Sequence, residues 1–258
     1  MNSRLDDGYN GRSVFISGGS SGVGAALGRL LASYGARVVL FARARSRLEA
    51  VVDEIAAAGG TAIAVAGDVR RSEDVNAAVR AGIERFGGLD VAVANAGIGD
   101  RRPLEELDDA SWNAYIDTNL TAAFWVCRAA GLHMRAAGRG SIVTVASGLG
   151  LVGMAGQIAY CASKGGMVLM TKALAAELAP KVRVNCLAPG GIETPMTDSD
   201  FSATDDPQEA RRRALARVPL GRFATTDEVA RAVAWVGSDN FSYATGSIVS
   251  MDGGTTAV

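Results

Sequence analysis

Histidine and cysteine are scarce in this chain of 258 residues, which holds one histidine, His133, and three cysteines. A single histidine leaves zinc sites and Ser-His-Asp catalysis without their usual side chains. Cys127, Cys161 and Cys186 are odd in number and far apart, without the spacing of a disulfide framework or a zinc site. We therefore expect free thiols in a reducing compartment and no metal centre.

Excess charge and long apolar runs are also missing. Lys and Arg number 26 against 27 Asp and Glu, a net charge of −1, which argues against nucleic-acid and membrane-surface partners. Residues 1–11 are polar and lack the apolar core of a signal peptide. No uncharged apolar run reaches the length of a membrane span. We expect a cytoplasmic protein with a polar N-terminal tail at 1–11.

Short apolar runs alternate with helical patterns along most of the chain. Runs that predict buried strands lie at 13–17, 37–41, 61–66, 89–94, 141–145, 182–187 and 247–250. Helical patterns lie at 22–34, 46–58, 72–86, 109–137, 159–178 and 227–236. Because the strands are apolar on both faces, the alternation predicts an α/β fold, a doubly wound parallel sheet with helices on both faces. The length supports one domain over 1–258.

Residues 194–216 break this alternation. The segment has an acidic first half and an Arg-rich second half with a helical pattern. Ligands of such folds bind at the carboxyl edge of the sheet, and we expect the segment to form a substrate lid over that edge. A plain surface excursion is the alternative.

The first predicted strand ends in a glycine-rich turn, Gly18-Gly19-Ser20-Ser21-Gly22-Val23-Gly24. Glycines let the backbone approach a pyrophosphate, and the following helix offers free N–H groups and a positive dipole. The spacing is Gly-x-x-x-Gly-x-Gly rather than the commoner Gly-x-Gly-x-x-Gly. The turn therefore indicates a dinucleotide site.

Tyr160 and Lys164 are four residues apart in a helical pattern, so they share one helix face. A free tyrosine has a pKa near ~10 and exchanges protons poorly at neutral pH. A fixed ammonium beside it would lower that pKa and let the phenol serve as an acid or a base. Alone, the spacing is more often ordinary helix surface.

Together, the motifs resemble the short-chain dehydrogenase/reductase family over residues 11–254. They are, in order, Gly18-x-x-x-Gly22-x-Gly24, Asn95-Ala96-Gly97, Asn119, Ser147, Tyr160-x-x-x-Lys164 and Pro189-Gly190. Ser17 stands where the family usually has Thr, and Ala94 where a second Asn is common. The resemblance implies a Rossmann-like dinucleotide-binding domain and hydride transfer between a nicotinamide cofactor and a ketone or secondary alcohol.

The resemblance also implies the catalytic roles. Tyr160 would be the proton donor in reduction and the acceptor in oxidation. Lys164 would lower its pKa and bind the nicotinamide ribose, and Ser147 would orient the substrate oxygen. Asn119 would hold a water that links Lys164 to solvent. Without the resemblance, Ser147 would be a strand-end turn residue and Asn119 a satisfied polar side chain in a helix.

The cofactor would lie along residues from six segments. The expected contacts are Gly18, Ser20, Ser21, Gly22, Val23, Gly24, Arg43, Asp68, Val69, Asn95, Ala96, Gly97, Tyr160, Lys164, Pro189, Gly190, Ile192 and Thr194. Arg43 follows the second strand, where NAD-dependent relatives carry an acid near the adenosine ribose, here at the place of Ala42. A guanidinium can bind a 2′-phosphate. We therefore expect NADP(H) to be preferred over NAD(H).

The substrate pocket is expected to be largely apolar, with Leu149, Val152, Met154, Gln157, Gly191 and Met196 as candidates. The sequence around Gln157 and at 184–190 resembles 3-oxoacyl-carrier-protein reductases, and another small ketone is equally open. A catalytically idle dinucleotide-binding regulator is the alternative from another class. Apolar residues around the helices at 109–137 and 159–178 lead us to expect a homotetramer, with a dimer as the second choice.

Overall fold

The computed structural model describes residues 8–202 and 204–257, and its centre is a seven-stranded parallel sheet. The strands are β1 (Ser13–Ser17), β2 (Arg37–Ala42), β3 (Thr61–Ala66), β4 (Val91–Ala94), β5 (Gly140–Val145), β6 (Val182–Pro189) and β7 (Ile248–Met251). Their order is β3-β2-β1-β4-β5-β6-β7, so the direction of winding reverses between β1 and β4. The predicted strands are confirmed to within one residue at each end, except that β4 starts at Val91 and β6 continues to Pro189.

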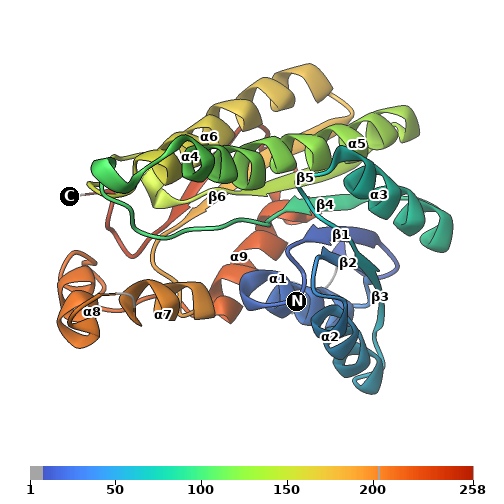
Figure 1. Ribbon diagram of the computed structural model, residues 1–258. Helices are drawn as coiled ribbons and strands as arrows, with labels where there is room; N and C mark the ends of the chain where they lie inside the picture. The colour runs from blue at the N-terminus through green and yellow to red at the C-terminus, as the bar shows by residue number, and fades with distance from the viewer. Residues whose placement is uncertain (1–7, 203, 258) are drawn as a thin grey trace.

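Helices cover both faces of the sheet, as Figure 1 shows. One layer holds α1 (Gly22–Ser33), α2 (Arg45–Ala57) and α9 (Thr226–Gly237). The other holds α3 (Ser72–Phe86), α5 (Ala122–Ala137) and α6 (Ile158–Leu178). Side chains alternate between the two cores: Val14 and Ile16 of β1 pack in the first, and Phe15 in the second. This two-sided burial is the reason that the strands read as continuous apolar runs.

The helix expected at 109–137 is interrupted. It forms α4 (Asp109–Tyr115), a π-helical turn (Ile116–Thr121) and α5. Asp108 caps α4 by accepting a hydrogen bond from the Ser111 N–H, and Gly138 ends α5 in the left-handed conformation, with φ of 82°. The backbone at both ends of the π-turn is right-handed helical, so the helical residue preferences along the chain do not separate it from an α-helix.

The segment at 194–216 forms two helices, α7 (Pro195–Ser202) and α8 (Pro207–Leu215), so the acidic first half is helical as well. Asp206 caps α8 through the Glu209 N–H at 3.0 Å, and Pro207 occupies its first turn. In Figure 1 the two helices (orange) lie together, outside the two layers that cover the sheet. Short 3₁₀ turns occur at Leu104–Glu106, Gly148–Gly150 and Asp239–Phe241.

Of the polar tail expected at 1–11, residues 1–7 lie outside the described residues, and the end of the tail is anchored at Tyr9, while Asn10 and Gly11 are exposed. Tyr9 is buried, and its hydroxyl donates to the Ala234 carbonyl of α9 at 2.7 Å. A single aromatic ring among polar neighbours is enough to anchor the segment to the core. Among the residues that the structure describes, no helix has the length and apolarity needed to span a bilayer.

Candidate active site

A cavity of about 1110 Å³ lies at the carboxyl edge of the sheet, where the segments after β1, β2, β3, β4, β5 and β6 meet. Ligands of open parallel sheets bind at this edge, next to the point between β1 and β4 where the strand order reverses. The cavity is lined by almost every site residue that the sequence predicts. Gly24 and Asn119 are the two that do not reach its surface, and both lie directly behind its wall.

The glycine-rich turn forms one end of the cavity. The N–H groups of Gly18 and Gly19 donate to the Phe41 carbonyl of β2, and Gly18 takes a φ of 74° that favours glycine. A Cβ at Gly24 would collide with the Gly18 carbonyl oxygen. No side chain caps α1, so the N–H groups of its first turn remain for a ligand. The turn thus fits a pyrophosphate on the α1 dipole.

Lys164 is a buried cation at the middle of the cavity wall. It is 4% exposed, and its Nζ donates to the Val145 carbonyl of β5 at 2.9 Å. Burial lowers its pKa to about 8, because the charged form loses hydration. The Nζ lies 5.7 Å from the centre of the Tyr160 ring on the same helix. The predicted pairing of the two side chains on one face of α6 is therefore present.

Tyr160 does not have the lowered pKa that the pairing alone suggests. Burial raises its pKa, and the Ser147 hydroxyl beside it acts in the opposite direction. The Lys164 ammonium is held by the Val145 carbonyl and lies over the ring rather than at the phenol oxygen. Tyr115 packs edge-on against the Tyr160 ring, with centroids 6.4 Å apart, and fixes its orientation.

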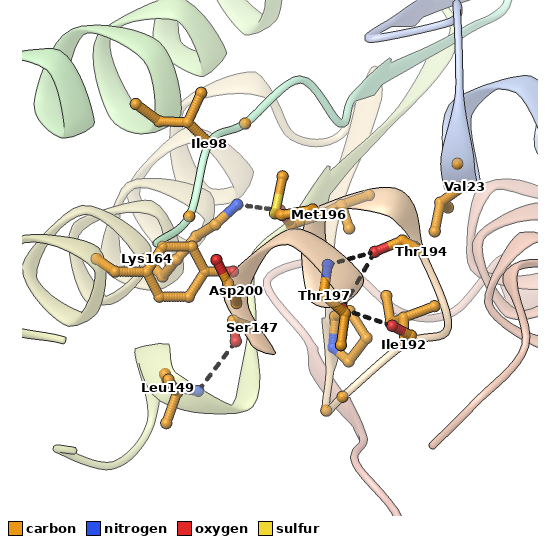
Figure 2. Close-up of a pocket in the computed structure, with 18 of the residues that line it drawn as sticks. Val23, Ile98, Ser147, Leu149, Lys164, Ile192, Thr194, Met196, Thr197 and Asp200 are labelled. Carbon is orange, nitrogen blue, oxygen red and sulfur yellow. Dashed lines mark hydrogen bonds between the residues drawn. The ribbon is translucent and has the colours of Figure 1, made fainter. Parts of the chain in front are cut away.

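Ser147 lies two residues after the end of β5 and lines the cavity. Its Oγ accepts a hydrogen bond from the Leu149 N–H at 3.2 Å and caps the 3₁₀ turn that follows. Figure 2 shows this bond beside Lys164. The hydroxyl proton stays available, so Ser147 can donate to a substrate oxygen next to the Tyr160 phenol.

Asn119 lies in the π-turn and connects the catalytic helix to the loop after β4. Its Oδ1 accepts from the Ile98 N–H at 2.8 Å, and its Nδ2 donates to the Ile98 carbonyl at 3.0 Å and to Ser163 at 3.1 Å. A Cβ at Gly97 would lie 3.2 Å from Asn119 Oδ1 and 3.5 Å from Lys164 Nζ. The glycine therefore keeps a narrow passage between Asn119 and Lys164. π-Turns of this kind occur frequently at functional sites.

The family model described as short chain dehydrogenase matches residues 12–205. The chain belongs to the short-chain dehydrogenases. It is therefore an oxidoreductase that acts on alcohol and ketone groups, and the resemblance read from its motifs is confirmed.

Similar proteins cover almost the whole of this short-chain dehydrogenase. A cis-4-hydroxycyclohexanecarboxylate dehydrogenase of Sinomonas cyclohexanicum is 40% identical over 98% of the chain and 100% of that protein. The 3-oxoacyl-[acyl-carrier-protein] reductase FabG of Thermotoga maritima is 38% identical over 95% and 97%. A crystal structure of levodione reductase superposes with a TM-score of 0.93 at 33% identity, over 97% and 99% of the two chains.

The departures from the family motifs leave its geometry intact. Ser17, in the place of the usual Thr, accepts hydrogen bonds on its Oγ from the N–H groups of Asn95 and Ala96, both at 3.1 Å. The Asn95 side chain donates to the Ser17 carbonyl at 3.0 Å. These bonds tie the loop after β4 to the end of β1 and set the distance between the two sides of the cavity.

Two arginines that the sequence does not single out line the cavity near the ends of β2 and β3, where the adenosine of the cofactor is expected. Arg43 lines the cavity as predicted, and Arg47 and Arg70 join it. Arg70 pairs with Asp68 at 2.6 Å, and its hydrogen bond is the main cause of the lowered pKa of that carboxyl. Arg45 instead points away and pairs with Glu49. Arg43 lies in the bend between β2 and α2, and Arg47 lies in the first turn of α2, so the Arg-rich run at 43–47 was the available signal for Arg47.

The loop after β6 leads into the lid and carries the last predicted contacts. Pro189, Gly190, Ile192 and Thr194 all line the cavity. The Thr197 hydroxyl donates to the Ile192 carbonyl at 2.7 Å and contacts the Thr194 hydroxyl at 3.1 Å. Figure 2 shows these bonds, which join the loop to the first turn of α7.

The substrate end contains the expected apolar residues and one acid that was not expected. Leu149, Val152, Met154, Gln157, Gly191 and Met196 all line the cavity. Asp200 also lines it, one turn of α7 beyond Met196. Burial, reinforced by the negative charge of Asp100, raises the pKa of Asp200 to about 6. The i, i+4 spacing from Met196 was a signal for it, but only once a helix is assigned there.

Proposed function

We propose that this protein reduces a ketone, or oxidises the corresponding secondary alcohol, with NADP(H) as its preferred nicotinamide cofactor and Tyr160 as the proton donor and acceptor. The observation that carries the proposal is the meeting of Tyr160, Lys164 and Ser147 at one wall of a cavity that begins at the glycine-rich turn. The bound nicotinamide supplies or accepts the hydride, and the protein residues control position and protons.

Tyr160 and Ser147 act on the substrate oxygen. In reduction, the Ser147 hydroxyl and the Tyr160 phenol donate hydrogen bonds to the carbonyl oxygen, and the Tyr160 proton moves to that oxygen as negative charge develops on it. In oxidation, the same phenol oxygen takes the proton of the alcohol. The raised pKa of Tyr160 keeps the phenol protonated at neutral pH, which suits the reductive direction.

Lys164 and Asn119 assist the proton transfer by Tyr160. Lys164 stabilises the phenolate electrostatically once the proton has left and would bind the ribose of the cofactor. Asn119, beside the passage at Gly97, would hold a water that returns a proton from solvent toward Lys164. Both are positioning residues rather than proton donors to the substrate.

The cofactor fits along the line of predicted contacts. The pyrophosphate would rest on the turn from Gly18 to Gly24, the adenine near Asp68 and Val69, and the nicotinamide end near Asn95–Gly97, Pro189, Gly190, Ile192 and Thr194. The absence of a carboxylate at Ala42, with Arg43, Arg47 and Arg70 around the adenosine end, supports NADP(H) over NAD(H).

The substrate class that we propose is a small ketone, because the pocket wall is largely apolar. Two of the similar proteins are named for a cyclic hydroxy acid and for a 3-oxoacyl group on a carrier protein, and both are candidates for the panel below. We further propose one domain over the whole chain, a homotetramer, and a cytoplasmic location. The three free thiols support a reducing compartment.

A substrate panel tests the function. Cyclic ketones, β-keto thioesters and linear methyl ketones are offered with NADPH and with NADH, and cofactor absorbance is followed. We expect turnover of at least one ketone, faster with NADPH. Cofactor binding by calorimetry without turnover of any carbonyl or alcohol would favour the idle dinucleotide-binding regulator instead.

A further inference from the structure

Asp200 is an acidic side chain that the lid helix α7 places in the cavity beside Tyr160. Figure 2 shows it in the same part of the cavity as Lys164 and Ser147. Burial is the main cause of the raised pKa of Tyr160, and the negative charge of Asp200 adds to it, so the two side chains are close. The carboxyl of Asp200 therefore faces the place of the reacting carbonyl.

No cation partner of Asp200 is present among residues 8–202 and 204–257. Arg211, on the neighbouring helix α8, instead pairs with Glu193 at 2.6 Å and with Asp198 at 3.6 Å. The charged group that acts on Asp200 is Asp100, on the loop after β4, and it has the same sign. A half-buried carboxylate without a partner has lost hydration that a ligand can replace.

The remaining charges around this wall do not neutralise Asp200. The Lys164 Nζ is turned to the Val145 carbonyl, and Arg102 pairs with Asp100 at 3.0 Å. Arg101 lines the cavity but packs against Gly156. The Gln157 Oε1 is buried, and no hydrogen-bond donor reaches it from the described residues. Around Tyr160, the substrate end thus offers one hydrogen-bond acceptor that carries a negative charge, the carboxylate of Asp200.

We propose that Asp200 is a specificity-determining residue, which favours carbonyl compounds with an ammonium or hydroxyl group near the carbonyl and disfavours those with a carboxylate there. This inference rests on the proposed function, because it concerns the substrate of the same site. The physical reason is the charge of Asp200. An anionic group on the substrate would bring a second negative charge to a poorly solvated wall, whereas a hydrogen-bond donor would pair with the Asp200 carboxylate.

Three matched ketones test the inference: 4-aminocyclohexanone, 4-oxocyclohexanecarboxamide and 4-oxocyclohexanecarboxylate. In the wild type we expect kcat/KM to fall in that order, with the carboxylate on the order of tenfold below the amide. In Asp200→Asn the amide-to-carboxylate ratio should approach one. Asp198→Asn removes the same charge from an exposed site on the same helix and should leave the wild-type ratio unchanged.

The pH gives a second readout, because the ratio of two substrates cancels the titration of Tyr160. With a pKa of about 6, Asp200 gains a proton as the pH falls from 7.5 to 5.5. The amide-to-carboxylate ratio should therefore fall in the wild type and stay constant in Asp200→Asn. The inference would be overturned if, at pH 7.5, the amide-to-carboxylate ratio of Asp200→Asn differed from that of the wild type by less than twofold. It would also be overturned if Asp198→Asn changed this ratio as much as Asp200→Asn does.

Thermal stabilisation of the NADP⁺-loaded protein by the same three compounds separates this inference from the proposed function. Selective stabilisation by the amine, lost in Asp200→Asn, would support the inference even without turnover. Equal stabilisation by all three would overturn it. If no ketone is turned over but the stabilisation is selective, the proposed function is contradicted and the inference about Asp200 still holds.

Discussion

At the scale of single residues, the two groups that matter most for proton transfer have pKa shifts in opposite directions. Burial lowers the pKa of Lys164 to about 8 and raises that of Tyr160. The raised pKa keeps the Tyr160 phenol protonated at neutral pH. The lowered pKa brings the titration of the Lys164 ammonium closer to neutral pH. The two side chains share one helix face, yet their pKa values are set by the cavity wall that surrounds them.

Replacing Tyr160 by Phe removes one hydroxyl and leaves the ring packing against Tyr115. We expect turnover of the best ketone to fall by on the order of 10² or more, the scale of a positioned proton donor. Cofactor affinity, measured by calorimetry, should change little. Tyr243→Phe, at an exposed position, is the control and should keep full activity. Near wild-type turnover in Tyr160→Phe would mean that another group donates the proton.

The buried Lys164 makes stability depend on pH. Its pKa is lower in the folded protein than in the unfolded chain, so the unfolded chain binds more protons between about pH 8 and 10.5 and stability rises with pH there. Relative to Lys164→Met, the wild type should gain about 2 kcal/mol in the free energy of unfolding between pH 7 and 9.5. Urea unfolding of both proteins at the two pH values measures this. A constant difference would show that Lys164 has an ordinary pKa.

Cofactor preference is also decided by few side chains. Ala42→Asp combined with Arg43→Ile adds a ribose-binding carboxylate and removes a phosphate-binding guanidinium, so preference should move toward NAD(H). The ratio of kcat/KM with NADPH and NADH measures the change. Arg45→Ile, at an exposed residue paired with Glu49, is the control. A wild type that prefers NADH would contradict the assignment.

At the scale of elements, α7 and α8 form the segment at 194–216 that we expect to be a substrate lid. Its first turn is bonded to the loop after β6 through Thr197, while the rest contacts the cavity with side chains such as Met196 and Asp200. Most of its ion pairs are exposed and contribute little to stability. A segment held by few buried contacts is expected to gain order when a ligand binds against it.

We therefore expect the backbone amides of residues 194–216 to exchange faster in the free protein than in the complex with cofactor and ketone. Hydrogen exchange followed by mass spectrometry measures the difference, and α6 serves as an internal reference because it packs against the sheet. Equal protection of the lid in both states would contradict its role as a substrate lid.

At the scale of the whole molecule, the outer surface of α4, α5 and α6 carries exposed apolar side chains. Trp112, Phe124, Leu132 and Leu169 are 38%, 38%, 51% and 68% exposed. Tyr115 and Met167, which lie on the same helices, are instead buried within the subunit. The exposed group remains a candidate for contact with further copies of the chain.

Static light scattering at micromolar concentration should give the mass of a tetramer. Leu169→Glu places a charge on the proposed interface and should reduce the mass, with the fold retained by circular dichroism. Leu220→Glu changes a 70% exposed residue outside α4, α5 and α6. A reduced mass in this variant would point to a second interface. A monomeric wild type would contradict the proposed assembly.

The sequence by itself determined the features that depend on local patterns. Strands buried on both faces, the glycine turn after β1, and Tyr160 and Lys164 on one helix face follow from residue spacing, because period and backbone conformation are local properties. The order of the motifs was enough to identify the family and to select the residues around the cavity.

Only the tertiary structure decided the features that depend on distances between segments far apart in the chain. It placed Asp200 beside Tyr160, brought Arg47 and Arg70 to the adenosine end, and set the π-turn that aims Asn119 at the loop after β4. It also reversed the expected direction of the Tyr160 pKa. Charge and burial act through space, so no spacing along the chain could give their balance at this wall.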